Sequence, residues 1–364
     1  MINIDAPLNS VSLGQVSVSI LRELFKRKVE CCIFPVQKNV DLGAYDLEPE
    51  FATWIQEGVS NSYKKYSRDF KTLKIWHIDG SERNLSSKNY LFTFHELDSL
   101  TPAEIGILRN QEHVFTASDF NRDTFMSFGI DNITTASLGL SPEFKDLDKR
   151  IYDKNITSWF IGGKFEKRKA HLEAIAGWVQ TFGNSQSHLL QLSLTNPFIH
   201  PNEPQPEQII LNSLKMDRRP FFFNFIPFTP KNSEFNKVLN SSDIVIDMSR
   251  GESFSLPSFQ AAAIGKHAIV HNNTGMKQWA NDKNASLVQS AEKMDPWDGK
   301  FFGPGGGFNQ GKYFNWNMDD YKKKLQEVCT KSVSNRLNSE GLKLQQTHTW
   351  TKTVDIILDK MGEV

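Results

Sequence analysis

The sequence predicts an α/β protein built from two doubly wound parallel sheets, and three observations lead to this prediction. The chain has 364 residues, more than one ordinary core needs, and this length suits two units of about 150 to 200 residues. Short apolar runs typical of buried parallel strands alternate with helical patterns along most of the chain. This alternation lapses once, in the polar and charged stretch 141–157, and then resumes.

In the first half, the expected order begins with a strand at Ile2–Ile4, a polar loop at Pro7–Gly14 and a helix whose apolar residues recur at helical spacing up to Phe25. The apolar run Val29–Val36 predicts a buried strand, and the polar and aromatic region 45–70 predicts helical pieces. Further strands are expected at Leu73–Ile78, Tyr90–Phe94 and His113–Ala117, with helices at Ala103–Leu108, capped by Thr101 and Pro102, and from Ser118 to Phe128, closed by Gly129.

The second round of alternation has the same character. The expected strands are Trp159–Ile161, Leu189–Leu194, Phe221–Phe225, Ile244–Asp247 and Ala268–His271, and the expected helices are His171–Phe182, Pro257–Ile264, Tyr321–Thr330 and Val354–Met361. Residues 197–206 and the glycine-rich stretch 303–311 are expected to be loops. We therefore divide the chain into an N-terminal Rossmann-like domain (1–150), a C-terminal Rossmann-like domain (151–335) and a helical segment (336–364) that packs back toward the N-terminal domain.

Composition narrows the class of protein. Lys plus Arg and Asp plus Glu are both 42, so the neutral chain has no electrostatic footprint for bulk nucleic-acid or membrane binding, although a local basic groove remains open. The three cysteines show no metal-site spacing and are expected to be buried free thiols in a reducing compartment. The N-terminus lacks the pattern of a signal peptide, and no apolar run approaches the roughly 20 residues of a membrane span. We expect a cytoplasmic protein.

The most specific motif is Ser249–Ala263, SRGESFSLPSFQAAA, which follows an expected strand and runs into an expected helix. Glu252 is expected just beyond the carboxyl end of the strand, where α/β folds bind their ligands. Ser255 and Leu256 are expected at the helix start, where free backbone N–H groups and the helix dipole favour a phosphate. Gln260 follows in the first turns of the helix, from which a side chain can reach the hydroxyls of a nucleotide.

This motif resembles the donor-binding signature of glycosyltransferase family four and its GT-B relatives, which reads roughly Ser-Arg-x-Glu-Gly-Phe-Gly-Leu-Pro-x-x-Glu-Ala-x-Ala. The resemblance implies the GT-B fold, in which two Rossmann-like domains face each other across a cleft. It further implies that Glu252 contacts the transferred sugar and Gln260 the nucleotide ribose. The family usually has Glu at the position of Gln260, so this chain loses a negative charge there while keeping a hydrogen-bond acceptor.

A second motif, FIGGKFEKRKA at 160–170, follows the first expected strand of the second half. Family members show Gly-Arg and then Lys-Gly at the positions of Gly163-Lys164 and Lys169-Ala170. Two cations at the carboxyl end of a parallel sheet suit a donor diphosphate, because they stabilise the charge on the departing nucleotide. Lys164 replaces the usual Arg and cannot form a bidentate pair, but the neighbouring Arg168 can substitute for it.

The remaining site predictions are weaker and come from the resemblance. Gly14 lies in the first loop, which in GT-B relatives faces the donor, although an ordinary turn explains this glycine equally well. His95, at an expected strand end, would face the reacting carbon or hold the acceptor, or it is a structural histidine. Thr274 and Gly275 match the small-residue loop that touches the sugar, and Gln278 occupies a position that the family often gives to Glu.

Taken together, the resemblance implies a retaining, metal-independent hexosyl- or pentosyltransferase with Glu252, Lys169 and His95 as candidate catalytic residues. Its co-substrate would be a nucleotide sugar linked to UDP, and no other cofactor is expected. The compact chain is similar to family-four enzymes found in phage genomes, which implies DNA modification with a hydroxymethylated pyrimidine as acceptor. The alternatives are a glycan, lipid or protein acceptor, a nucleotide-sugar epimerase, or a non-catalytic GT-B protein that binds a nucleotide or glycan, which the two Glu-to-Gln changes favour.

Overall fold

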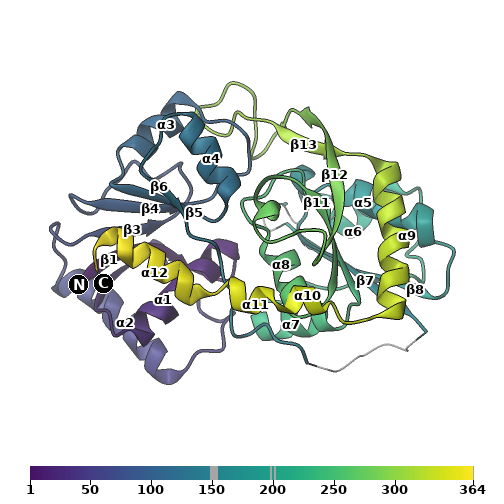
Figure 1. Cartoon of the computed structure of the whole chain (residues 1–364), viewed down its shortest axis with the longest axis horizontal. Coiled ribbons are helices and arrows are strands. Elements are labelled where there is room, and N and C mark those ends of the chain that lie inside the picture. The colour runs from purple at the N-terminus through teal and green to yellow at the C-terminus, as the bar shows by residue number, and fades with distance from the viewer. Residues whose placement is uncertain (148–154, 197–198, 201, 364) are drawn as a thin grey trace.

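The first strand, β1 (Ile2–Leu8), is almost entirely buried, because helices cover both faces of its sheet. The structure is a computed structural model that describes residues 1–147, 155–196, 199–200 and 202–363 (Figure 1). In the N-terminal half, six parallel strands lie in the order β2-β1-β3-β4-β5-β6. The other elements of this half are β2 (Cys31–Val40), β3 (Thr72–Ile75), β4 (Asn89–Thr93), β5 (His113–Thr116), β6 (Ile133–Thr135), α1 (Ser12–Lys26), α2 (Pro49–Lys64), α3 (Pro102–Arg109) and α4 (Asp119–Ser127).

The C-terminal half contains seven strands in the order β13-β12-β11-β10-β7-β8-β9, all parallel except for the antiparallel pair of β12 and β13. Its strands are β7 (Thr157–Lys164), β8 (His188–Thr195), β9 (Phe223–Phe225), β10 (Ile244–Asp247), β11 (His267–Asn272), β12 (Ser286–Met294) and β13 (Tyr313–Trp316). Its helices are η1 (Lys167–Lys169), α5 (His171–Phe182), α6 (Pro206–Ser213), α7 (Asn232–Asn240), α8 (Leu256–Ala263), η2 (Thr274–Gln278) and α9 (Met318–Ser334). The predicted α/β class with two doubly wound parallel sheets is thus confirmed.

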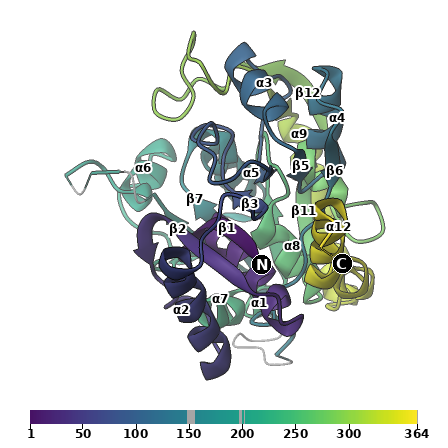
Figure 2. The same ribbon diagram turned by 90° about the vertical axis from the view of Figure 1, so that its left-hand side faces the viewer.

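The last segment returns to the N-terminal half. It consists of α10 (Ser339–Leu342), α11 (Leu344–Thr347) and α12 (Trp350–Met361), and α12 lies beside α1 (Figure 1). Arg27, directly after α1, pairs with Asp355 of α12 at 2.6 Å, and the apolar face of α12 joins the core cluster that contains β1. Figure 2 shows the same arrangement from the side, with both chain ends on the N-terminal half. The predicted boundary at 150/151 lies outside the described residues.

One apolar cluster continues from the N-terminal half into the C-terminal half. It includes β1 and α1, then α8 and η2, and finally Trp350 at the start of α12. Three consecutive buried alanines, Ala261–Ala263, allow α8 to be buried along most of its length, and Ala262 and Ala263 belong to this cluster. A second cluster fills the space between β7, β8, α5 and α9. The two halves are therefore connected by apolar packing as well as by the polypeptide linker. This packing determines which surfaces of the halves face each other.

Several expectations about single elements can be compared with the structure. Helix α3 begins at Pro102 with a complete capping box between Thr101 and Glu104, as its sequence predicts. Gly129, which comes two residues after the end of α4, has a positive φ of 75°, as predicted. Strands β6, β12 and β13 and helices α6 and α7 were not expected. Cys31 and Cys32 are buried free thiols as expected, whereas Cys329 on α9 is only half-buried, contrary to expectation. No helix of the described residues has the length and apolar character needed to cross a bilayer.

Candidate functional site

The topology of the C-terminal sheet places a switch point between β7 and β10, and we refer to the region at the carboxyl ends of these two strands as the crevice. Successive strands extend from β7 toward β9 on one side and from β10 toward β13 on the other, so this point is a topological switch. Doubly wound sheets bind ligands at the carboxyl ends of the strands that flank such a point. Lys164 is the last residue of β7, and the Ser249–Ser255 segment follows β10 directly. The two predicted motifs therefore flank one crevice.

The charged side chains of the two motifs form one connected cluster. Glu252 Oε1 lies 2.5 Å from Arg168 Nη1 and 2.7 Å from Lys169 Nζ. Arg168 Nη2 is 2.6 Å from Glu166 Oε1, and Lys164 Nζ is 2.8 Å from Glu166 Oε2. The side chains of the two carboxylates are at least nine-tenths buried, whereas Lys164 keeps 34% of its side chain exposed. Lys164 is thus the cation of this cluster that water reaches most easily.

The cluster strongly favours the charged forms of its members. Burial alone would raise the pKa of Glu166, but the positive charges of Arg168 and Lys164 outweigh this effect and lower the pKa to about 2. The same balance applies to Asp247 at the end of β10. Its burial is outweighed by the charge of Lys169 and by hydrogen bonds from Ser249 and Ser255, which lower its pKa to about 2. Both carboxylates are therefore ionised at neutral pH.

The turn before α8 has an unusual backbone. Ser255 has φ 67° and ψ 79°, a left-handed conformation that favours glycine, and the family signature has Gly at this position. The Ser255 hydroxyl donates a hydrogen bond to Asp247 Oδ2 and does not cap α8. The N–H groups of the first turn, starting at Leu256, therefore have no side-chain cap. This helix start can accept an anion from the side of the crevice.

The loop after β11 holds the Glu252 backbone in place. Thr274 Oγ1 accepts a hydrogen bond from the Glu252 N–H at 2.9 Å, and the Gly275 N–H donates to the Glu252 carbonyl at 2.8 Å. A Cβ on Gly275 would lie 2.0 Å from the Ser253 carbonyl oxygen, so no other residue fits there without a shift. On the β7 side, Gly163 has φ 127° and its Cα faces the stem of Lys169. These positions shape the site through the backbone.

Gln260 is 2% exposed and points to the N-terminal half. Its Nε2 donates to Gln15 Oε1 at 3.2 Å, and Gln15 Nε2 donates to Asn232 Oδ1 at 3.1 Å. This chain of amides connects α8, α1 and α7 beside the crevice. The sequence contains no local signal for Gln15 or Asn232, because their partners lie more than 200 residues away.

Two further predicted residues lie in structural surroundings. Gly14 packs against its own loop, where a Cβ would lie 2.0 Å from the Asn9 carbonyl oxygen. His95 is 2% exposed, bonds the Ser99 carbonyl through Nε2 at 2.9 Å and packs edge-on against Phe125. Both environments suit a residue that fixes a loop of the N-terminal half, and among the described residues no hydrogen bond or ion pair joins His95 to the charged cluster.

Gln278 also lies apart from the charged cluster. Its Oε1 accepts a hydrogen bond from the Asp119 N–H at 2.8 Å, which satisfies a free donor at the start of α4 in the other half. The neutral Gln278 side chain therefore caps α4. This geometry does not support the expectation that Gln in place of Glu at this position removes a negative charge from the sugar site.

The two halves meet directly over the crevice. Ser253 Oγ donates to Asn121 Oδ1 at 2.5 Å, and a Cβ on Gly251 would lie 2.4 Å from the Glu96 carbonyl oxygen. The bridging loop, residues 303–312, lies against the segment 97–104 of the N-terminal half. Its contacts are Thr101 Oγ1 to Gly307 O at 2.6 Å, Asn309 N to Glu104 Oε1 at 3.0 Å and Lys312 N to Asp98 Oδ1 at 2.7 Å.

Sequence reasoning missed two residues near this junction, His77 and Tyr313. His77 follows β3, and its pKa is lowered by surrounding protein, with Lys164 and Arg168 adding to the effect and Glu96 opposing it. Tyr313 of β13 is fully buried, and its hydroxyl has no hydrogen-bond partner among the described residues. Only the folded chain brings these residues together, because they come from opposite sides of the junction.

Comparisons with known proteins support the fold. No family model matches the sequence, and no curated protein matches it significantly. Among solved structures, the chain is similar to sucrose-phosphate synthase from Thermosynechococcus elongatus, with 12% identity, coverage of 100% of this chain and 99% of that one, and a TM-score of 0.68. It is also similar to Anabaena HepE in complex with UDP-glucose, with 10% identity, full coverage of both chains and a TM-score of 0.62. It resembles TarM with 12% identity and a TM-score of 0.58, matching over 81% of this chain but only 55% of TarM. The chain therefore has the GT-B fold.

Proposed function

We propose that this protein is a glycosyltransferase that takes a sugar from a UDP-linked donor. The observation that carries the proposal is the group formed by Lys169, Glu252 and the uncapped start of α8 at the switch point of the C-terminal sheet. Cations and free helix N–H groups recognise a diphosphate, and a carboxylate beside them recognises sugar hydroxyls. UDP is our choice of nucleotide because HepE, which shares the fold, has been solved with UDP-glucose.

In this proposal, the donor diphosphate competes for cations that are already paired. Lys164, Arg168 and Lys169 face the carboxylates Glu166 and Glu252. A bound diphosphate would draw on the exposed Lys164 and on Lys169, while Arg168 keeps both carboxylates in position. The carboxylate oxygen that Lys169 releases then becomes an acceptor for a sugar hydroxyl, so donor binding and sugar positioning are coupled.

We further propose a retaining, metal-independent reaction. The bond between the anomeric carbon and the donor phosphate oxygen breaks, and the acceptor oxygen forms a new bond on the same face of the sugar. The departing phosphate takes the proton of the acceptor hydroxyl, so the protein itself supplies no nucleophile. Its contribution is positioning and charge stabilisation, with Lys164 and Lys169 neutralising the developing negative charge. Transfer that persists after chelation and gives the donor's anomeric configuration would support this scheme.

A donor screen tests the central proposal. The full chain is heated with a panel of UDP-, GDP- and ADP-sugars, and release of the nucleotide is measured in parallel. A donor at 100 times its dissociation constant should add about 2.7 kcal/mol to the free energy of unfolding, and the stabilisation should be lost in Lys169→Met. A panel without any stabilising nucleotide or nucleotide sugar would contradict the proposal.

For the acceptor, we propose a hydroxymethylated pyrimidine in DNA. One surface of the N-terminal half is consistent with a nucleic acid: Lys64, Lys65 and Arg68 are exposed beside Tyr63, which is 86% exposed, and Tyr66. Among the described residues, no carboxylate pairs with these three cations. Alternating cations and aromatic rings bind nucleic-acid backbones and bases. This surface covers the last turn of α2 and the residues after it, so it would hold DNA outside the crevice and affect binding more than turnover.

Salt dependence distinguishes the acceptor classes. Replacing Lys64, Lys65 and Arg68 with Ala should weaken DNA binding and reduce the slope of log affinity against log salt by about two to three. A DNA acceptor would then show a higher KM with an unchanged kcat. If binding of DNA is insensitive to salt or to these substitutions, a glycan, lipid or protein acceptor becomes the better assignment.

A non-catalytic GT-B protein that binds a nucleotide or glycan is the second candidate. The observation that favours it is the Gln260–Gln15 hydrogen bond, which uses the expected ribose contact within the protein. Release of free sugar or transfer from any donor in the panel would exclude this candidate. Nucleotide binding without either reaction would establish it.

A further inference from the structure

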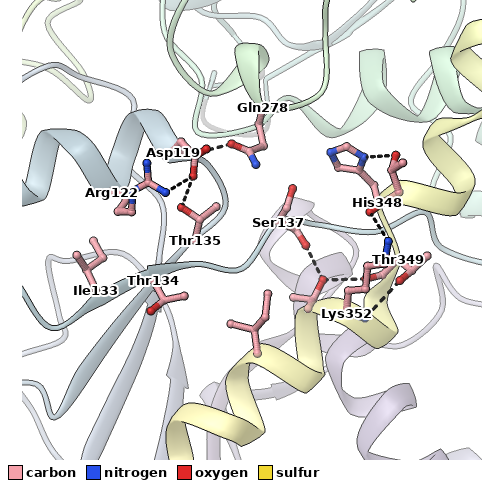
Figure 3. Close-up of a pocket in the computed structure, with 13 residues that line it drawn as sticks. Asp119, Arg122, Ile133, Thr134, Thr135, Ser137, Gln278, His348, Thr349 and Lys352 are labelled. Atoms are coloured by element: carbon pink, nitrogen blue, oxygen red, sulfur yellow. Dashed lines mark hydrogen bonds and ion pairs between the residues drawn. The ribbon is translucent and has the colours of Figure 1, made fainter.

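A pocket outside the charged cluster opens where three parts of the chain meet (Figure 3). Its walls come from α4 and β6 of the N-terminal half, from Gln278 of η2 in the C-terminal half, and from the 347–356 segment that leads into α12. Its volume of about 520 Å³ lies in the range of small-molecule sites. The pocket does not include any residue of the proposed donor site, so a ligand could bind here whether or not the proposed function holds.

The lining of this pocket is rich in hydroxyl groups. Six of its residues carry one: Thr134, Thr135, Ser137, Thr347, Thr349 and Thr353. Two isoleucines, Ile133 and Ile356, supply apolar surface beside them. Such a mixture of hydroxyls and aliphatic carbons matches a ligand that itself alternates hydroxyl groups with C–H surface.

The charged side chains of the pocket already interact with protein partners. Arg122 Nη1 lies 2.7 Å from Asp119 Oδ1, and the same oxygen accepts a hydrogen bond from Thr135 Oγ1 at 2.7 Å. Lys352 Nζ donates to the carbonyl oxygens of Gln346 and Thr347 at 3.1 and 3.3 Å. A phosphate or carboxylate would have to displace these partners, so the lining favours an uncharged ligand.

Two polar groups here lack partners among the described residues. Ser137 Oγ is buried and makes no hydrogen bond, whereas the carbonyl oxygen of Ser137 accepts one from Thr353 Oγ1. The NH₂ group of the half-buried Gln278 makes no hydrogen bond to the described residues, whereas the carbonyl oxygen of this amide accepts the bond from the Asp119 N–H. Figure 3 shows the Ser137 side chain pointing toward the space between Gln278 and His348. A buried hydroxyl without a partner is unfavourable, and a ligand hydroxyl would satisfy it.

We propose that this pocket is a second site, which binds an uncharged mono- or disaccharide. Its ligand contacts the N-terminal half, the C-terminal half and the returning segment together, and therefore stabilises one arrangement of the two halves. Ser137 Oγ and the Gln278 NH₂ group are the groups that the sugar completes.

The test uses the full chain and saturation-transfer NMR with glucose, N-acetylglucosamine and maltose, and with glucose 6-phosphate as the charged comparison. At least one neutral sugar should bind saturably and more tightly than glucose 6-phosphate. Ser137→Ala should raise its Kd by about three- to tenfold, the range for one neutral hydrogen bond. Because Ser137→Ala removes a buried unsatisfied hydroxyl, the free variant should be at least as stable as the wild type. The matched control Ser127→Ala, on the exposed side of α4, should bind normally.

Hydrogen exchange then locates the sugar. Protection should appear at the pocket segments 119–122, 133–137 and 347–356, and it should persist in Lys169→Met, in which donor binding is lost. Three results would overturn the proposal: no saturable sugar binding, binding restricted to the phosphorylated sugar, or sugar binding that Ser137→Ala leaves intact and Lys169→Met abolishes. The last result would assign the sugar to the proposed donor site.

Discussion

The ammonium group of Lys169 lies 2.7 Å from the carboxylate of Glu252, although the two residues are 83 positions apart in the sequence. Burial disfavours the charged form of Lys169, but the charges of Glu252 and Asp247 raise its pKa above the ordinary value. The cation that we assign to the donor diphosphate is therefore present at neutral pH and is held by the carboxylate that we assign to the sugar.

Replacing this cation should remove catalysis and leave the fold intact. In Lys169→Met, Glu252 keeps its ion pair with Arg168, so we expect cooperative unfolding near the wild-type midpoint. Transfer should fall about 100-fold or more in kcat/KM, the range for loss of one group that stabilises transition-state charge. The control Lys167→Met alters an exposed side chain that bonds the Trp297 carbonyl. Equal activity of the two variants would contradict the assignment of Lys169.

In the proposed donor site, Glu166 would compete with the donor for cations, so its removal should strengthen nucleotide binding. Because Glu166 is ionised and pairs with Lys164 and Arg168, Glu166→Gln removes one negative charge beside these two cations. We expect the Kd of UDP, measured by calorimetry, to fall by about three- to tenfold. The control is Glu173→Gln, which removes the partner of Arg250 outside this cluster. Weaker UDP binding in Glu166→Gln would show that Glu166 positions the cations more than it neutralises them.

Ser255 combines an unfavourable backbone with a favourable side chain, and two variants separate these contributions. Ser255→Ala keeps the positive φ but removes a hydrogen bond to buried Asp247, and should lower the free energy of unfolding by about 1–3 kcal/mol. Ser255→Gly loses the same hydrogen bond but relieves the left-handed strain, so it should recover roughly 1 kcal/mol. Urea unfolding measures both. A glycine variant less stable than the alanine variant would show that the strain is negligible.

The bridging loop should stabilise the observed arrangement of the halves. Thr101→Val removes the hydroxyl that caps α3 and contacts Gly307 while keeping the shape of the side chain. We expect a loss of about 1–2 kcal/mol in stability and faster proteolysis within residues 303–312. The same substitution at the exposed Thr330 of α9 is the control. A loop as resistant to protease as in the wild type would mean that the Thr101 contact does not hold it.

Buried histidines should make stability fall with acidity. Burial lowers the pKa of His171 to about 3, with the charge of Lys169 adding to the effect, whereas the unfolded value is near 6.5. The folded state thus favours neutral His171, and its contribution is complete above pH 6.5 and is lost as the pH falls toward 3. The slope is at most about 1.4 kcal/mol per pH unit. His171→Leu should flatten the curve from urea unfolding between pH 7 and 5, and the exposed control His200→Leu should not.

The sequence predicts best the elements whose pattern is local. The strand Ile244–Asp247 and the helix His171–Phe182 have the predicted bounds. Each is defined by the spacing of its own apolar residues and by a change of pattern at its ends. Strand β12 was missed because its second half is polar and exposed, so that it lacks the apolar run of a central strand. In the site, the motifs 160–170 and 249–263 were predicted from their order in the chain, since each follows an expected strand. The partners of Gln260 and Gln278 depend on how the halves meet, and no local pattern encodes that.

The return of α12 to the N-terminal half has a consequence for biosynthesis. Val354, Ile357 and Met361 belong to the same core cluster as β1, although the whole C-terminal half is translated between them. During translation, part of the apolar surface of the N-terminal half therefore stays uncovered until α12 leaves the ribosome. Premature termination before residue 350 should therefore release a chain prone to aggregation, even though both sheets are fully encoded.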